Sequence, residues 1–306
     1  MGYAQASLED LDEIVGLNDF FAGGTSFSNV NRGRAQKLLG AFRDGRWRKK
    51  VQYVAPVTPA VEQKVPVVRA ATMSESKVAF SYQPIVDTST QTIIAYEALL
   101  RGAGDKSFAD ISQDISDVEW VNFDTNSRAQ AIGTAASLNL KVDLHLNYMA
   151  RNNEDAMAAA DTTLVTAWRN GIDPTRIVLE IDYDQLIGDI ESFSAIINKY
   201  RGAGLRVCID HFGAGRASLD LLEPMRPEMI SLDLNLIRGI ESNGPRQAIV
   251  RGMLQTCNDL GIDLIAKYVE SEAEYRWLVE EGVDLMQGNY LAKAGFETLP
   301  ELDKGE

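Results

Sequence analysis

The stretch from residue 177 to residue 210, IVLEIDYDQLIGDIESFSAIINKYRGAGLRVCID, contains the pattern that decides the fold. Two short apolar runs, Ile177–Ile181 and Leu205–Ile209, enclose the amphipathic segment Asp184–Arg201, whose apolar residues recur at helical spacing. A strand, a helix and a second strand in this order predict two parallel strands joined by a crossover helix. An acidic residue stands at or near the end of each apolar run.

The same unit recurs outward in both directions, from about residue 77 onward. The further apolar runs are Val78–Val86, Ile93–Leu100, Val142–Leu146, Met229–Leu232, Leu264–Ala266 and Leu285–Gln287, and the further helical segments are Asn126–Leu138, Arg246–Leu260 and Glu272–Glu281. About eight strands in about 230 residues predict an α/β fold, a TIM-like (β/α)8 barrel. Reacting groups in such a barrel stand at the carboxyl ends of the strands. Polar residues fall at these ends: Glu97, Asn147, Glu180, Asp210, Asp233 and Gln287.

The first 74 residues differ from this repeating part. They contain short helical patterns, and then Pro56, Pro59 and Pro66 interrupt a stretch with little periodicity. We expect residues 1–74 to form a small helical appendage and linker, and residues 75–306 to form the barrel domain. Residues 29–50 hold eight Lys or Arg and a single acid. Two interpretations stay open for that basic stretch: a solvated helix face that leans on the acidic body, or a docking segment for an acidic partner.

Composition excludes several classes of protein. The formal net charge of −14 disfavours general nucleic-acid binding, which needs a basic surface. No apolar run approaches the roughly 20 residues that a membrane span requires. Only Cys208 and Cys257 occur, both in apolar surroundings, so we expect a reducing, cytoplasmic setting. Two histidines nearly exclude a histidine-rich metal site, so any metal would be held by oxygen ligands.

An ordered set of motifs carries a resemblance to a known family. The motifs are QPIVD at 83–87, YEALLR at 96–101, LHLN at 144–147, LEI at 179–181, DHFGAG at 210–215, SLD at 231–233, AKYVE at 266–270 and MQGNY at 286–290. Any one of them is weak. Together, over roughly residues 77 to 300, they resemble the EAL domain family of cyclic-di-GMP phosphodiesterases.

The resemblance implies a TIM-like barrel of the EAL type, whose second strand often runs antiparallel to the first. Active members hydrolyse one phosphodiester of cyclic-di-GMP with the help of magnesium or manganese ions, which activate a water molecule. The positions that match the acidic and amide ligands of the metal site are Glu97, Asn147, Glu180, Asp210 and Asp233. The positions that match contacts to the nucleotide are Gln83, Glu97, Leu99, Arg101 and Gln287.

Three positions that the family uses for hydrolysis are replaced. His211 stands in place of the Asp that helps hold the second cation, Ser231 in place of a Lys, and Lys267 in place of the Glu that acts as general base. The Gly that follows this Glu in the family is Tyr268. Because each such catalytic group contributes roughly 10²–10⁴-fold, we expect that no catalytic site is intact.

Lys267 has two interpretations. Carboxylates that gather without a metal repel one another and raise each other's pKa, and an ammonium among them would offset part of that charge. We therefore hypothesise that Lys267 stands in for a divalent cation and makes the site metal-free. In the alternative, the side chain reaches solvent and a single magnesium or manganese ion still binds.

Three functions stay open at this point. The expected one is a degenerate, non-hydrolytic regulator in bacterial cyclic-di-GMP-type signalling that acts through a protein partner, with or without the nucleotide. The second is a receptor that binds cyclic-di-GMP without cutting it. The retained Gln83, Glu97, Leu99 and Arg101 favour this function, and crowding of the pocket by Lys267 and Tyr268 opposes it. The third is a slow, metal-dependent phosphodiesterase. A homodimer is a further expectation that rests on the resemblance alone.

Overall fold

The computed structural model describes residues 78–102, 108–112, 115–148, 153–182, 190–213, 219 and 222–302. The expected N-terminal helices, the basic stretch and the boundary between residues 74 and 75 lie outside the described residues and stay predictions. Within the described part of the chain, no helix is long and apolar enough to cross a membrane.

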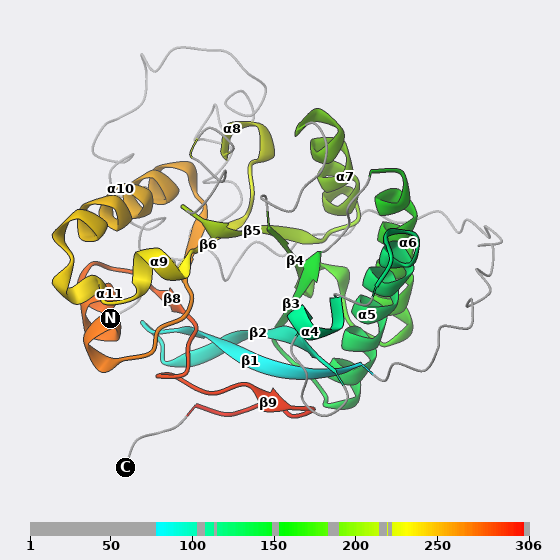
Figure 1. Ribbon diagram of the computed structural model, residues 1–306, viewed down its shortest axis with the longest axis horizontal. Coiled ribbons are helices and arrows are strands. Elements are labelled where there is room, and N and C mark those ends of the chain that lie inside the picture. Colours follow the sequence, from blue (N-terminus) through cyan, green and yellow to red (C-terminus); the bar gives the residue numbers. More distant parts are fainter. Residues whose placement is uncertain are drawn as a thin grey trace, which may run out of the picture. The chain divides into compact units, whose positions relative to one another are not determined.

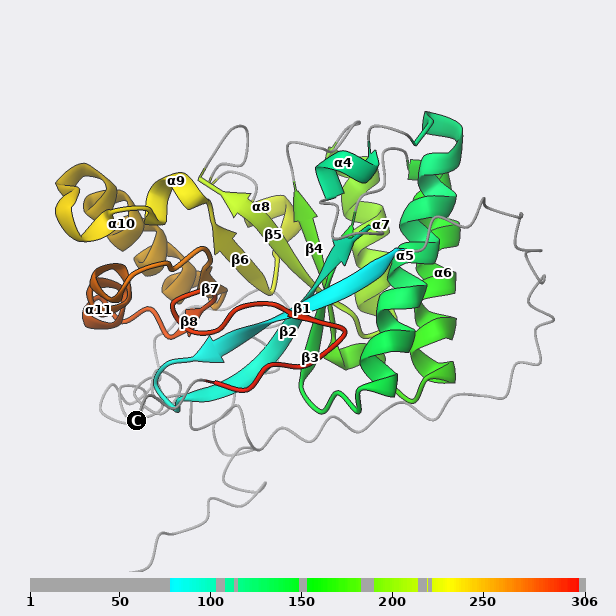
Figure 2. The ribbon, with the colours of Figure 1, turned by 60° about the horizontal axis from the view of Figure 1, so that its bottom comes forward.

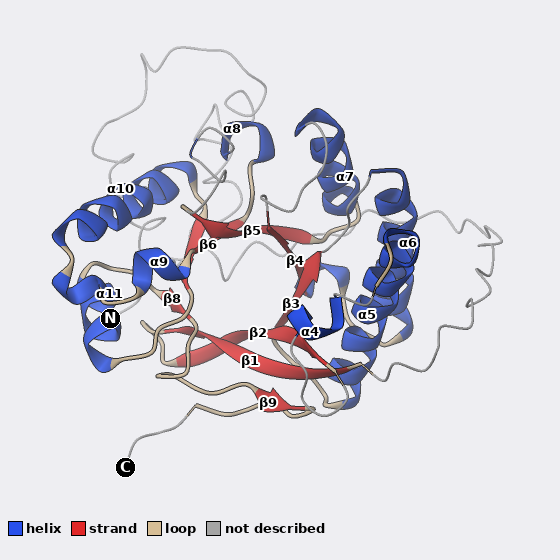
Figure 3. Ribbon diagram, in the orientation of Figure 1, coloured by secondary structure: helices blue, strands red, loops and turns tan. Residues whose placement is uncertain are grey.

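Eight of the described strands form a closed ring with helices outside it, which confirms the predicted barrel (Figures 1 and 3). The strands of the ring are β1 Ala79–Asp87, β2 Thr92–Arg101, β3 Asp143–Tyr148, β4 Ile177–Asp182, β5 Arg206–Phe212, β6 Met229–Leu232, β7 Asp263–Ala266 and β8 Leu285–Met286. Neighbours from β2 round to β8 are parallel, whereas β1 is antiparallel to both β2 and β8 and closes the ring. A short strand that the sequence did not indicate, β9 Gly295–Phe296, pairs with β1 outside the ring.

The described helices are α4 Phe108–Ser112, α5 Asp117–Ser137, α6 Asn153–Arg169, α7 Ile190–Gly202, α8 Leu222–Met225, α9 Leu234–Ile237, α10 Gly244–Leu260 and α11 Glu272–Glu280. Figures 1 and 2 show α5, α6 and α7 side by side along one part of the ring. Helix α5 begins well before the expected Asn126. The central part of α5 buries Asp124 and Arg128 as an ion pair. Because charged residues do not contribute to an apolar stripe, the hydrophobic pattern of the sequence did not reveal the start of this helix.

The two faces of the strands bury different side chains, because successive residues of a strand point to opposite sides. Residues on the outer face, such as Leu179, Ile181 and Phe212, belong to the large apolar core shared with the helices. The inner face contributes a second, small apolar cluster of Ile85, Ala95, Val178, Cys208, Met229 and Ile265. We call this inner cluster the barrel floor. It seals the interior of the barrel below the candidate site.

Candidate functional site

A layer of polar side chains lies one step above the barrel floor. Two residues along a strand return to the same face, so the positions that follow the floor residues also point into the barrel. These positions are Glu97 after Ala95, Glu180 after Val178, Asp210 after Cys208, Ser231 after Met229 and Lys267 after Ile265. All five side chains belong to buried residues. Strand periodicity alone therefore brings together residues that are up to 170 positions apart.

Lys267 occupies the middle of this layer. Its Nζ lies 2.6 Å from Glu180 Oε2, 3.0 Å from Asp210 Oδ1 and 3.3 Å from Glu97 Oε2. The side chain of Lys267 is 3% exposed, so it does not reach solvent. A lysine ammonium has three N–H donors, and three carboxylate oxygens surround it here. We call Lys267 with Glu97, Glu180 and Asp210 the ion cluster.

Neutral side chains also contact the oxygens of the two glutamates. Gln287 Nε2 donates to Glu97 Oε2 at 2.8 Å, and Asn147 Nδ2 donates to Glu97 Oε1 at 3.2 Å. His145 Nδ1 lies 2.7 Å from Glu180 Oε1. Burial first, and then the charge of Lys267, lower the pKa of His145 to about 3, so its imidazole is neutral and donates through Nδ1–H. His145 was not among the predicted site residues, and only its strand alternation with Leu144 and Leu146 marks it in the sequence.

The protonation of the ion cluster is uneven. Burial, followed by the charge of Glu180, raises the pKa of Glu97 to about 7. Burial also acts to raise the pKa of Asp210, but Lys267, His211 and Ser231 outweigh it and hold that pKa at about 2. Burial disfavours a charged Lys267, yet Asp210, Glu180 and Glu97 raise its pKa well above the usual value. The cluster therefore contains a fixed cation, an ionised Asp210 and a Glu97 that changes charge near neutral pH.

The three positions that the resemblance predicts to be replaced catalytic groups, His211, Ser231 and Lys267, gather near Asp210 together with Tyr268. Ser231 Oγ donates to Asp210 Oδ1, the oxygen that Lys267 also contacts. His211 Nδ1 lies 3.5 Å from Asp210 Oδ2. Tyr268 is linked to the same group through His211, because its hydroxyl lies 3.0 Å from His211 Nε2. The substitutions read from the sequence as separate losses are thus neighbours in space.

Asp233, the fifth predicted metal ligand, has a different environment. Its Oδ1 accepts a hydrogen bond of 2.8 Å from the backbone N–H of Asn235, so it caps the start of α9. Among the residues that the structure describes, no group of three or more His, Cys, Asp or Glu side chains is arranged to hold a metal ion. The metal role of Asp233 and its companions stays a prediction.

The predicted nucleotide contacts other than Glu97 and Gln287 lie outside the ion cluster. Gln83 on β1 donates from Nε2 to the carbonyl oxygen of Ala292 at 3.2 Å, which ties β1 to the segment after β8. Arg101 Nη1 donates to the carbonyl oxygen of Leu100 at 3.0 Å at the end of β2. Leu99 is half-buried on the same strand. These residues are placed on the two strands that carry the first two motifs, and their contact with a nucleotide stays a prediction.

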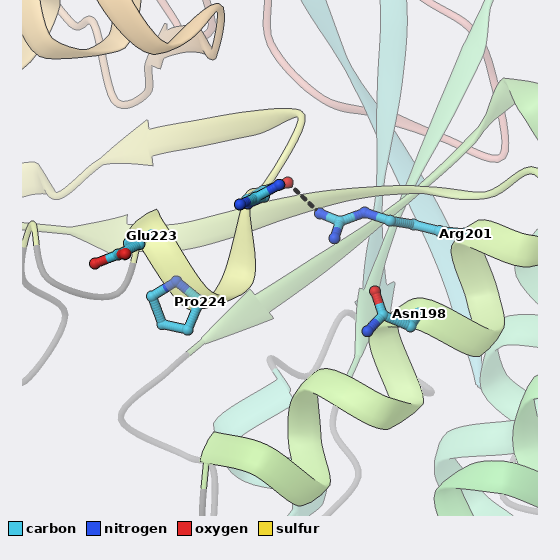
Figure 4. Close-up of a pocket in the computed structure, with 5 residues that line it drawn as sticks. Asn198, Arg201, Glu223 and Pro224 are labelled. Carbon is cyan, nitrogen blue, oxygen red and sulfur yellow. Dashed lines mark hydrogen bonds between the residues drawn. The ribbon is translucent and has the colours of Figure 1, made fainter. Parts of the chain in front are cut away.

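A pocket whose lining includes no residue of the ion cluster is shown in Figure 4. Its lining residues are Asn198, Arg201, Glu223, Pro224 and Arg226. Helix α7 ends here, just before β5 begins, so the pocket is at the amino-terminal end of the strands, where conserved features usually serve stability. The Arg201 guanidinium donates to Glu228 at 2.8 Å and to the carbonyl oxygen of Arg226. These contacts join α7 to the segment before β6. They give no sign of a reactive group in this pocket.

Comparison with known proteins shows the family to which the chain belongs. Residues 68–294 match the EAL domain, and the chain belongs to the EAL domain family. It is 32% identical over 226 residues to the blue light- and temperature-regulated antirepressor BluF of Escherichia coli, a match that spans 73% of this chain and 56% of BluF. Over 125 residues it is 27% identical to the probable cyclic di-GMP phosphodiesterase PdeA of E. coli, covering 17% of that protein.

Solved structures agree with this assignment. A standalone EAL protein of Vibrio cholerae O395 in its c-di-GMP-bound form has 34% identity and a TM-score of 0.71, over 76% of this chain and 98% of that one. BlrP1 of Klebsiella pneumoniae, in complex with manganese and cyclic-diGMP, has 26% identity and a TM-score of 0.70, over 94% of this chain and 72% of that one. The chain thus belongs to a family with cyclic-di-GMP-binding members, and spans about half of its antirepressor relative.

Proposed function

We propose that this chain is a non-hydrolytic EAL regulator in cyclic-di-GMP-type signalling, which acts through a protein partner. The observation that carries the proposal is the ammonium of Lys267, which lies within 3.3 Å of three carboxylates at the family's ligand positions. A magnesium ion needs near-ideal octahedral coordination by oxygens at about 2.0–2.1 Å. The residues present do not fit such an ion, because a cationic nitrogen already occupies the space between its oxygen ligands.

The proton chemistry of hydrolysis also lacks its base. A general base has to accept the proton of the attacking water, and Lys267 stays protonated because three carboxylates raise its pKa. Ser231 brings no positive charge to a phosphate, and its hydroxyl donates to Asp210 instead. His211 contributes no negative charge for a second cation. No described group of the ion cluster is therefore free to begin the reaction.

The charge of the ion cluster also disfavours a phosphate without metal. Three carboxylates and one ammonium have a formal charge of −2, which becomes −1 when Glu97, whose pKa is about 7, holds its proton. A phosphodiester carries a negative charge, and like charges in a buried site repel strongly. In a metal-loaded site, divalent cations make the net charge of the site favourable for a phosphate. The proposed metal-free site would repel the nucleotide that its relatives bind.

A protein partner is supported by the kind of relative that the chain resembles. BluF is described as an antirepressor, and an antirepressor counteracts a repressor protein. The match includes 73% of this chain. A barrel that has lost its chemistry can retain its surface as a binding module, since function belongs to sites and surfaces rather than to the fold.

The second candidate is a receptor that binds cyclic-di-GMP without cutting it. The similarity to the V. cholerae EAL protein favours this candidate. That protein was solved in its c-di-GMP-bound form, and the match to this chain covers 98% of its length. Gln83, Leu99 and Arg101 keep the residue types that match nucleotide contacts in the family. Charge repulsion from the ion cluster opposes this candidate, and a direct titration separates the two.

The first test is a calorimetric titration of cyclic-di-GMP into the purified full chain, with and without magnesium or manganese, followed by chromatography of the cell contents. We expect neither binding heat nor linear product under any of these conditions. Binding without product would select the receptor. Linear product formed with metal would overturn the proposal in favour of a phosphodiesterase.

A reversion experiment tests the physical account. The triple variant His211→Asp, Ser231→Lys, Lys267→Glu restores the family's residue types, and we expect it to gain manganese binding. The matched control is Lys199→Glu, which makes the same change of charge at a surface ion pair, 3.1 Å from Asp161, and should gain nothing. If a folded triple variant gains neither manganese binding nor turnover, the assigned roles of the three positions are wrong.

A further inference from the structure

Two of the departures from the family contact each other across the mouth of the barrel. His211 on β5 and Tyr268 after β7 are 57 positions apart in the sequence, yet His211 Nε2 lies 3.0 Å from the Tyr268 hydroxyl. Their rings are stacked, with centroids 6.2 Å apart and planes inclined by 19°. In the family these positions hold an Asp and a Gly, which could not form this pair. The pair therefore departs from the pattern that the resemblance implies.

The pair spans the end of one strand. Strand β6 lies between β5 and β7 in the ring, so a link between His211 and Tyr268 crosses the carboxyl end of β6, where Ser231 belongs to the polar layer. His211 Nδ1 is 3.5 Å from Asp210 of the ion cluster. The side chain of His211 is 37% exposed, whereas that of Lys267 is 3% exposed. The pair thus lies between solvent and the ion cluster on this side of the mouth.

Both residues adopt backbone conformations that are unusual for their types. His211 has a φ of 52° and Tyr268 a φ of 65°, in the left-handed region that favours glycine. The register between β5 and β6 shifts between Ile209 and Phe212, which marks a β-bulge around Asp210 and His211. Bulges re-aim side chains next to functional sites. This bulge allows two successive residues, Asp210 and His211, to approach the same mouth.

The loop that carries Tyr268 is held firmly in place. The backbone N–H of Val269 donates to the carbonyl oxygen of Gln287 at 3.0 Å, and that of Tyr290 donates to the carbonyl oxygen of Val269 at 3.1 Å. Gly288 fits this contact because a Cβ there would lie 2.1 Å from Val269 O. Strained backbone persists only where its surroundings determine it. Tyr268 is held in its left-handed conformation by a close backbone contact on its carboxyl side.

From these observations we infer that His211 and Tyr268 form an aromatic cover over the ion cluster, which keeps water and dissolved cations away from Lys267. The inference deepens the proposed function and rests on it: the lysine neutralises the carboxylates, and the cover keeps competing cations out. His211 and Tyr268 are positioning residues, since they act through the ion cluster. They determine the specificity of the mouth, which excludes small cations as well as phosphate.

Access to Lys267 can be measured without any metal or nucleotide. The full chain is given a short pulse of acetic anhydride, and acetylation of each lysine is read by peptide mass spectrometry. The three carboxylates keep Lys267 mostly protonated in every variant and so slow its labelling equally, which means that differences in rate between variants report access. We expect Lys267 to label about tenfold faster in Tyr268→Gly than in the natural protein, the factor for the loss of one net hydrogen bond with its ring contact. Tyr268→Phe keeps the stack without the hydroxyl and should give an intermediate rate. Lys199 provides a surface reference in every sample.

Two controls separate a lost cover from a loosened protein. Tyr275→Ala removes one ring of another aromatic pair, Tyr275 with Tyr290, whose centroids are 5.3 Å apart, and should leave Lys267 labelling unchanged. Cys257 is fully buried in the outer core, so its alkylation reports global opening and should stay negligible in all variants. An unchanged Lys267 rate in a folded Tyr268→Gly protein would overturn the cover. So would an increase that Cys257 alkylation matches.

A second measurement keeps this inference distinct from the proposed function. Manganese affinity is compared between Lys267→Gln and the double variant Lys267→Gln with Tyr268→Gly. The proposed function predicts that Lys267→Gln alone gains manganese binding over the natural protein. The cover predicts a further gain of about tenfold in the double variant. Equal affinities of the single and double variants would reject the cover while leaving the role of the lysine standing.

Discussion

The outer and inner faces of the same barrel strands are built on different physical principles. On β4, Leu179 and Ile181 point into the large apolar core beneath the helices, whereas Val178 belongs to the small barrel floor and Glu180 to the ion cluster. The outer face is stabilised by apolar burial, which depends on shape and area. The inner face depends on a balance of charges. A chain can therefore exchange the chemistry of the interior while the outer core preserves the fold.

The largest effect is expected at the centre of the inner face. Lys267→Gln leaves three buried carboxylates without their cation, so unfolding free energy at pH 7.5 should fall by about 3–5 kcal/mol. Urea denaturation followed by circular dichroism measures this loss. Part of it should return at pH 5, where the carboxylates take up protons. A loss below about 1 kcal/mol would mean that charge balance does not govern the inner face.

A substitution of similar size on the outer face should behave differently. Leu179→Ala removes apolar volume from the outer core and should cost about 3 kcal/mol, within the range for buried leucines. The same urea measurement at pH 5 and pH 8 checks that this cost is independent of pH, because no group near the cavity gains or loses a proton. A cost that varied with pH as in Lys267→Gln would remove the distinction between the two faces.

The balance of charges should also make stability depend on pH. Burial raises the pKa of Glu97 from 4.5 to about 7, so the folded protein binds this proton more tightly than the unfolded chain does. The resulting stabilisation is fully present below pH 4.5 and is lost as pH rises through 7. Between pH 5 and pH 8 the natural protein should lose on the order of 1–3 kcal/mol through this group.

Glu97→Gln is the matched test, because the amide cannot titrate and its single carbonyl oxygen can still accept one of the two hydrogen bonds, from Asn147 or from Gln287. Urea midpoints at pH 5, 6, 7 and 8 should fall for the natural protein and stay nearly level for the variant. An identical slope in both proteins would assign the pH dependence to other groups.

The smallest effect is expected at Asp233, whose side chain belongs neither to the outer core nor to the ion cluster. Its side chain caps α9, so Asp233→Ala should lower the free energy of unfolding by about 1 kcal/mol. Lys267 labelling should not change, because Asp233 is not part of the ion cluster. A large rise in that labelling would instead show that Asp233 supports the mouth of the barrel.

The sequence was sufficient for the barrel and for most of the polar layer. Strands such as β4 and β6 read as short apolar runs with polar residues at their ends, and their order along the chain predicts the ring. Glu97, Glu180 and Asp210 could be brought together in advance because strand ends of a barrel meet at one mouth. The second strand is antiparallel to the first, as the resemblance implied.

Other features depend on register and closure, which one sequence does not reveal. The bulge at Asp210 and His211 adds one residue to β5 relative to β6, and no local signal in DHF marks it. The contact of His211 with Tyr268 requires two strands on either side of a third. His145 alternates with apolar residues like any wall residue, and only the neighbouring β4 gives it Glu180 as a partner.

The gathering of His211, Ser231, Lys267 and Tyr268 around Asp210 also makes these four positions depend on one another. A return of Lys267 to Glu alone would collect four carboxylates with no cation, and a return of Tyr268 to Gly alone would leave His211 without its ring partner. Each single step backwards passes through a less stable or less shielded protein. Under the proposed function, a metal site would therefore need several of these positions to change together, because no single substitution keeps both the charge balance and the cover.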